Sequence, residues 1–155
     1  MADAQPRPWT PTQERVGTVL IKVMSALNVW LFRLTRGRLG ARFPGGAPVC
    51  LVTVIGRRTG KPHTVPLLYL QRGDDVVLVA SKGGMSHHPL WYLNMMANPR
   101  VEVEIGTNRR PMIVHQATDD EKARLWPELV KMYPDYDSYQ ARTTRRIPVL
   151  VCTPA

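Results

Sequence analysis

Two glycine-containing turns in the middle of the chain place basic residues at the ends of apolar runs. The first turn, residues 56–61 (GRRTGK), follows the apolar run 51–55, and the second, residues 81–84 (SKGG), follows the run 76–80. Glycine lets the backbone approach a ligand closely with its N–H groups exposed, while arginine and lysine supply positive charge. The two turns together are therefore typical of a site for a phosphorylated, polyanionic ligand.

The first turn is not a Walker A phosphate-binding loop. Only three residues separate Gly56 from Gly60, and Pro62 follows Lys61, whereas that motif needs four residues and then Lys-Ser or Lys-Thr. The turn also lies between two predicted strands rather than before a helix. A basic turn taken by itself is usually solvated surface, so both interpretations stay open at this point.

The second turn leads into a segment that combines aromatic and amide side chains. Residues 89–96 are predicted to form a short helix that ends before an Asn-Pro pair. This helix carries Trp91, Tyr92 and Asn94, and such flat rings and an amide beside a glycine turn suit a ligand with a ring system. The alternative is that Trp91 and Tyr92 are core aromatics.

Three tyrosines recur every three residues near the C-terminus: Tyr133, Tyr136 and Tyr139. On a helical turn they would fan over neighbouring faces, where they could cover a pocket and supply a hydroxyl. The alternative is three partly buried amphipathic aromatics. We find no persuasive Ser-His-Asp or Cys-His set, and the four histidines have no carboxylate or cysteine at ligand spacing, so we predict no metal site.

The composition indicates one basic globular domain. The chain has 155 residues, a net charge of +9 and 44% apolar residues, so an anionic partner is expected: a nucleic acid, a membrane surface or a phosphorylated cofactor. Phenylalanine is scarce and no aromatic RNA-binding pattern is found, so we predict no nucleic-acid partner. Cys50 and Cys152 lie in apolar runs without CxxC spacing, which favours buried free thiols in a reducing cytoplasm.

The N-terminal part, residues 1–44, is predicted to precede the main domain, residues 45–155. Residues 1–12 read as a polar, proline-rich tail without a signal peptide, and residues 13–36 have the apolar spacing of a helix with basic flanks. That helix either packs on its own domain or on a second copy, or lies on an anionic membrane, which would make the protein peripheral on the inner face of the plasma membrane. Lys22 and Arg33 interrupt the apolar span and argue against a transmembrane helix.

The rest of the pattern favours an α+β fold that is mainly β. Short turn signals and alternating apolar residues predict about six antiparallel strands, at 49–55, 64–71, 76–81, 101–105, 111–116 and 147–152. Residues 118–121 (TDDE) form a capping box that opens a helix to about residue 132, and residues 135–141 add one more turn. Six strands with few helices indicate a small closed or half-closed barrel.

Several strings of the chain closely resemble the deazaflavin-dependent nitroreductases of mycobacteria and related actinobacteria. They are GRRTGKP (56–62), Pro66-Leu67, SKGG (81–84), PLWYLN (89–94), ANP (97–99), and WPEL through MYP to YQ and IPV between residues 126 and 149. The resemblance covers residues 45–154, while the N-terminal helix matches only in character. It implies a split β-barrel that binds coenzyme F420, an 8-hydroxy-5-deazaflavin with a phospholactyl-polyglutamate tail.

The resemblance also assigns roles to residues. It implies that the first turn holds the phosphate and tail, through Arg57, Arg58, Thr59, Gly60 and Lys61. The deazaflavin and ribityl region would be lined by Pro66, Ser81, Lys82, Gly83, Gly84, Pro89, Trp91, Tyr92 and Asn94. The acceptor side would be formed by Tyr133, Tyr136 and Tyr139, with a tyrosine, Ser81 or water as the proton source.

The expected function is that of a reductase. A hydride would pass from reduced F420 to an electron-poor conjugated acceptor such as a quinone, nitroaromatic or unsaturated lactone, and the protein would mainly position the two molecules. An FMN-dependent oxidoreductase on the same barrel and a non-enzymatic deazaflavin carrier are the alternatives. A homodimer is also an open expectation.

Overall fold

The computed structural model describes residues 6–155, so the first part of the predicted N-terminal tail lies outside the described residues. Residues 6–10 are extended and lead into the long helix α1 (Pro11–Leu34). The remaining elements are β1 (Val49–Ile55), β2 (Pro62–Leu68), β3 (Leu70–Arg72), β4 (Asp75–Val79), the 3₁₀ turn η1 (Lys82–Gly84), α2 (Leu90–Ala97), β5 (Arg100–Ile105), β6 (Asn108–Gln116), α3 (Asp119–Met132), α4 (Asp135–Arg142) and β7 (Val149–Pro154).

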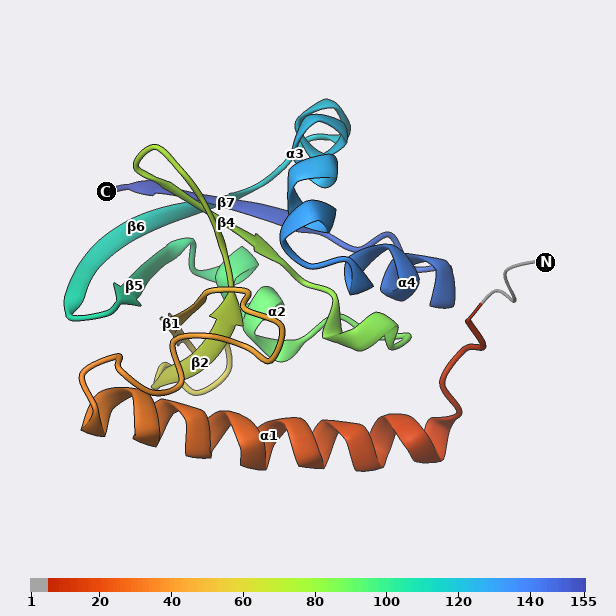
Figure 1. Cartoon of the computed structure of the whole chain (residues 1–155), viewed down its shortest axis with the longest axis horizontal. Helices are drawn as coiled ribbons and strands as arrows, with labels where there is room; N and C mark the ends of the chain where they lie inside the picture. Colours follow the sequence, from red (N-terminus) through yellow and green to blue (C-terminus); the bar gives the residue numbers. More distant parts are fainter. Residues whose placement is uncertain (1–5) are drawn as a thin grey trace.

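The strands form one curled antiparallel sheet in the order β2-β1-β5-β6-β7-β4-β3. The predicted strand over 64–71 is wrong in one respect, because it breaks at Tyr69 into β2 and β3, which makes seven strands rather than six. The strand β2 pairs with β1, whereas β3 pairs with β4 at the opposite edge. A single residue therefore joins the two edges of the sheet, which requires the sheet to curl into a half-barrel (Figure 1).

The last strand, β7, lies inside the sheet rather than at its edge. It pairs with β6 on one side and with β4 on the other. Alternate side chains of these strands fill the barrel interior together with Met95 of α2. Cys50 and Cys152 are buried free thiols in this core, as predicted, and burial raises the pKa of Cys152 to about 12.

The helix ends follow from capping residues. The Thr118 side chain accepts from the Glu121 amide while the Glu121 carboxylate accepts from the Thr118 amide, so the predicted capping box at the start of α3 is confirmed. A second box, Thr10 with Gln13, starts α1 two residues before the predicted position. These reciprocal contacts satisfy amides that have no partner within the first helical turn.

The helix α1 lies along one side of the barrel and keeps most of its surface exposed (Figure 1). Phe32 is its single buried side chain, and Arg33 contacts Thr64 of β2 and Glu104 of β5. Large apolar side chains cover its outer face, namely Val16, Val19, Leu20, Val23, Met24, Leu27, Trp30 and Leu34. By length and composition, α1 could span a membrane; the prediction against a transmembrane helix stays a prediction.

Candidate functional site

A cavity of about 740 Å³ lies between α1, strand β2 and the segment that follows β4. Such a volume suits a cofactor or drug-sized ligand. The walls are mostly apolar, and polar groups enter at a few points. The residues from the barrel side that line it include Val54, His63, Pro66, Leu67, Leu68, Val79, Pro89, Trp91 and Asn94.

The second turn forms one wall of this cavity. Ser81, Lys82 and Gly83 line it, and the backbone of Lys82, Gly83 and Gly84 is left-handed, with φ of 44°, 61° and 75°. Glycine adopts this region freely, whereas Lys82 is a non-glycine residue held there. Gly84 faces away from the cavity, because a Cβ on it would lie 2.5 Å from the carbonyl oxygen of Tyr139.

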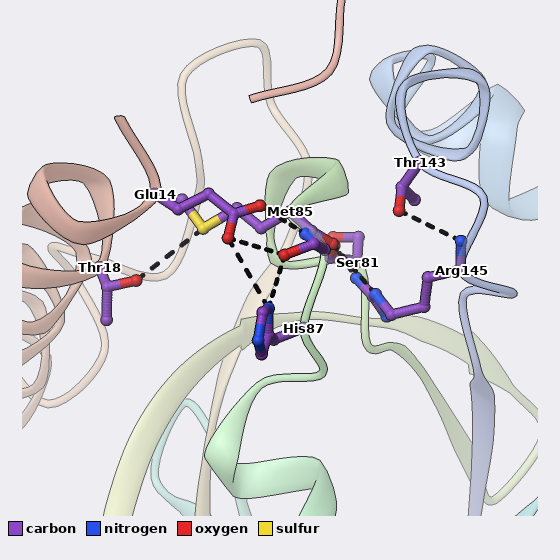
Figure 2. Close-up of polar contacts among 8 residues, drawn as sticks. Glu14, Thr18, Ser81, Met85, His87, Thr143 and Arg145 are labelled. Carbon is purple, nitrogen blue, oxygen red and sulfur yellow. Dashed lines mark hydrogen bonds and ion pairs between the residues drawn. The ribbon is translucent and has the colours of Figure 1, made fainter. Parts of the chain in front are cut away.

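Helix α1 holds the far end of this turn through polar contacts (Figure 2). The Glu14 carboxylate accepts from the Ser86 amide at 2.6 Å and from the Ser86 hydroxyl at 2.8 Å. These bonds, first of all the one from the Ser86 amide, lower the pKa of Glu14. The indole N–H of Trp9, in the extended segment before α1, also donates to the Gly83 carbonyl at 2.8 Å, so α1 and the residues that lead into it contact the turn at two points.

The three tyrosines come together in the part of the cavity wall where α4 packs against η1. The hydroxyls of Tyr133 and Tyr139 are 3.0 Å apart, and the rings of Tyr133 and Tyr136 meet edge to face at 5.0 Å. All three line the cavity, and Tyr136 is buried. Burial, followed by the bond to Tyr139, raises the pKa of Tyr133 well above its usual range, so this phenol keeps its proton.

The first turn lies beside the cavity, not in its wall. Its residues Arg57, Arg58, Thr59, Gly60 and Lys61 are exposed, and the chain enters the wall directly afterwards at Pro62. Asn94, which is buried and lines the cavity, accepts from both the backbone and the guanidinium of Arg57, at 3.1 and 3.2 Å. One side chain, Asn94, thus joins the turn to the cavity wall, and the exposed cations of the turn lie beside the cavity.

Most of the residues that the sequence singled out are therefore neighbours. Besides the five residues of the first turn, two of them do not line the cavity. Gly84 packs on α4, and the Tyr92 hydroxyl donates to Gln116 while its ring packs on His88. Tyr92 therefore has the position that the alternative prediction gave it, because it packs against the barrel interior as a core aromatic. Trp91 lines the cavity as well as touching that core.

The sequence interpretation missed the wall that α1 provides. Its residues Thr18, Ile21, Lys22, Ser25 and Ala26 line the cavity, and Phe43 of the following linker packs edge to face on Tyr133. Ser25 and Ala26 are small residues outside the apolar stripe of α1, and this break in apolar character away from the stripe is the available signal. Helices are placed by tertiary packing, which a single amphipathic pattern does not specify.

Two lysines from different elements make the cavity electropositive at its turn end. Lys82 comes from η1 and Lys22 from α1. Burial is the main cause that lowers the pKa of Lys82, opposed by Glu14 and assisted by Arg145 and Lys22. Among residues 6–155, no group of three His, Cys, Asp or Glu side chains could hold a metal ion.

This arrangement fits a flat ring with an anionic tail. The apolar walls suit a ring, the exposed cations of the first turn lie beside the cavity and suit an anionic tail, and phenol hydroxyls are present in the wall. Among the described residues that line the cavity, no nucleophile is hydrogen-bonded to a base; the Ser86 hydroxyl, which contacts His87 Nδ1, lies outside the cavity. The chemistry that the site supports is thus transfer between two bound molecules rather than covalent catalysis.

Comparisons with known proteins agree. The sequence profile of the family described as F420H(2)-dependent quinone reductase matches residues 24–154. The F420H(2)-dependent quinone reductase Rv1261c of Mycobacterium tuberculosis (strain ATCC 25618 / H37Rv) is 39% identical over 147 residues, which are 91% of this chain and 94% of that protein.

Two solved structures are similar as well. The F420-H2 dependent reductase FDR-A is 38% identical with a TM-score of 0.64, over 68% of this chain and 93% of its own. A structure described as a domain-swapped dimer is 31% identical with a TM-score of 0.65, over 92% of this chain and 99% of its own. The family match begins inside α1, so the likeness extends further towards the N-terminus than residue 45. The chain belongs to the F420H(2)-dependent quinone reductase family.

Proposed function

We propose that the cavity between η1, α1 and the three tyrosines is where a hydride passes from reduced F420 to a quinone. The observation that carries the proposal is the set of groups at one cavity: mostly apolar walls, a hydrogen-bonded phenol pair in the wall, and the exposed cations of the first turn beside it. Reduced F420, when bound, supplies the hydride. The residues of the chain bind, orient and protonate.

The binding end is assigned to the two turns. Arg57, Arg58 and Lys61 would bind the phosphate and carboxylates of the tail by charge-assisted hydrogen bonds. Lys82 and the left-handed backbone of Gly83 would face the ring region, beside Trp91. Asn94 keeps the first turn in register with the cavity through its bonds to Arg57.

The acceptor end is assigned to the phenol pair and α1. A quinone that accepts a hydride becomes a hydroquinone only when a proton follows, and a phenol with a raised pKa keeps a proton ready to donate a hydrogen bond. Tyr133 would orient or protonate the quinone oxygen, with Tyr139 as its hydrogen-bond partner at 3.0 Å. The α1 wall excludes water from the reacting pair.

Cofactor titration tests this function. F420 and FMN are each titrated into the protein while tryptophan fluorescence is followed, and oxidation of reduced F420 is then measured against a panel of quinones and nitroaromatics. We expect F420 to bind much more tightly than FMN, with weaker binding at high salt. Equal or tighter FMN affinity overturns the cofactor assignment, and tight F420 binding without turnover favours a carrier.

We further propose that the outer face of α1 rests on an anionic membrane. Val23 and Leu27 are more than half exposed, and at about 100° per residue they lie on the side opposite Thr18, which faces the cavity. Exposed arginines flank this apolar face, namely Arg15, Arg33, Arg36 and Arg38. An apolar face with basic flanks is the pattern of an interfacial helix, and it would bring lipid-soluble quinones near the cavity.

Vesicle sedimentation of the full chain tests the membrane proposal. The variant Val23→Asp/Leu27→Asp is compared with wild type on anionic and neutral vesicles, and Ile113→Asp on β6 serves as the control for an added charge at an exposed apolar site. We expect wild type and Ile113→Asp to sediment with anionic vesicles only, and the double variant to stay in solution. A wild-type dimer that ignores vesicles and is dissociated by the double variant would assign this face to a second copy.

A further inference from the structure

One arginine outside the cavity donates hydrogen bonds to the backbone of the segment that follows β4. Arg145, in the loop before β7, donates from Nη2 to the Ser81 carbonyl at 2.7 Å and from Nη1 to the Ala80 carbonyl at 3.0 Å. Its Nε donates to the Met85 carbonyl at 3.1 Å. One guanidinium therefore spans both ends of the η1 turn (Figure 2).

The turn needs such support because its backbone is unfavourable. Lys82 is a non-glycine residue with a positive φ, and two further left-handed residues follow it. The two that follow are glycines, which adopt this region freely, but a positive φ at a non-glycine residue such as Lys82 persists only where neighbouring structure fixes it. The internal bonds of the turn, from the Gly84 amide to Ser81 and from the Met85 amide to Lys82, are those of a single 3₁₀ turn.

The fourth contact of Arg145 extends the support to His88. Nη1 lies 2.9 Å from His88 Nδ1, and because a guanidinium has only donors, Nδ1 must accept. The ring is therefore neutral with its proton on Nε2, and its face packs on Tyr92 at 4.7 Å. Burial and Arg145 both lower the pKa of His88, in agreement with a neutral ring.

We propose that Arg145 is the positioning residue of the reaction site: it fixes the η1 backbone so that Ser81, Lys82 and Gly83 point into the cavity. Arg145 itself does not line the cavity and acts through these three residues. Its planar fork reaches three carbonyls at once, which a lysine ammonium on a flexible stem does not reproduce. The role in catalysis, though not the support of the turn, rests on the proposed function.

The test compares Arg145→Lys and Arg145→Met with wild type. The control is Arg146→Met, a neighbouring exposed arginine whose contact is an ion pair with Asp119. Amide hydrogen exchange of the ligand-free protein is measured for residues 80–86, together with F420 affinity and steady-state kinetics. Because two or more charge-assisted bonds are lost, exchange in this segment should rise roughly ten-fold or more in Arg145→Lys, with no change in the control.

The kinetics separate positioning from general stability. In Arg145→Lys we expect a lower kcat and weaker F420 binding with little change in the KM for the quinone, because none of the guanidinium hydrogen bonds of Arg145 goes to the three tyrosines. Unchanged exchange in residues 80–86 overturns the proposal. Faster exchange that also reaches β1 and β5 overturns it too, because Arg145 would then stabilise the whole fold.

The test also covers a variant that does not fold and a wild-type protein that does not bind F420. If Arg145→Met does not fold, Arg145→Lys still keeps the cation and decides the outcome. If wild type binds no F420, the proposed function fails, while the exchange experiment on the ligand-free protein still supports or overturns the support of η1.

Discussion

Two adjacent glycines in the η1 turn offer a matched pair of substitutions, Gly83→Ala and Gly84→Ala. Both have left-handed backbones, so an added Cβ strains each by about 1 kcal/mol. At Gly83 the Cβ would meet nothing within 4 Å, whereas at Gly84 it would lie 2.5 Å from the Tyr139 carbonyl oxygen and 3.0 Å from its Cα. Backbone must therefore shift only in Gly84→Ala.

The expected magnitudes follow from these distances. Forcing an extra methyl into close-packed structure costs about 1–3 kcal/mol, so the free energy of unfolding should fall by about 1 kcal/mol in Gly83→Ala and about 2–4 kcal/mol in Gly84→Ala. For a domain of this size, each kcal/mol lowers Tm by about 2–4 °C.

Thermal unfolding followed by circular dichroism measures the pair. We expect Tm to fall by about 3 °C for Gly83→Ala and by about 6–12 °C for Gly84→Ala. Because Gly84 packs on the helix that carries Tyr139, quinone turnover should also fall in Gly84→Ala. Equal losses of Tm in the two variants would refute the reasoning, since they would mean that η1 does not press on α4.

Three further predictions concern the ends of the cavity. Tyr133→Phe should lower kcat by about 10²-fold without changing F420 affinity. Tyr136→Phe, whose hydroxyl is outside the 3.0 Å pair, should change kcat much less. Equal effects of the two substitutions on kcat would show that the hydroxyl pair has no special role. Lys61→Ala should raise the F420 dissociation constant roughly ten-fold, measured by fluorescence titration, with the exposed Lys131→Ala on α3 as control. The pKa of Lys82 is lowered, mainly by burial, so F420 affinity should decline as the pH rises at a pH below the usual range for lysine deprotonation. Lys82→Arg should move that decline in affinity to higher pH. If the decline stays at the same pH in Lys82→Arg, another group causes it.

Local sequence signals predicted those elements whose ends are fixed by nearby residues. The Thr118 to Glu121 box specifies the start of α3 because both partners lie within one turn. The Gly73 and Gly106 turns likewise mark the hairpins β3–β4 and β5–β6. The break at Tyr69 carries no such signal, since residues on both sides are equally suited to strands and only the curl of the sheet decides where the chain changes edges.

The candidate site was predictable where a residue type implies a role, and less so where the direction of a side chain decides whether it faces the cavity. Trp91 and Tyr92 are adjacent on a helix and point about 100° apart, so the pattern could not say which of them faces the cavity. The sequence likewise could not say which of Gly83 and Gly84 faces the cavity. Arg145 was not found at all, because an isolated arginine in a loop is normally solvated and its carbonyl partners are 60 to 65 residues away.

The interior position of β7 has a consequence for the order of events during protein synthesis. The strands β2, β1, β5 and β6 form one part of the sheet and β4 and β3 the other, and β7 supplies the hydrogen bonds that join them. Residues 149–154 emerge from the ribosome after all other strands, so both parts wait with an unpaired edge until then. We therefore expect folding to be slow and the sheet to close only after β7 has been made, with the chain that lacks β7 dependent on chaperones to prevent edge-to-edge association.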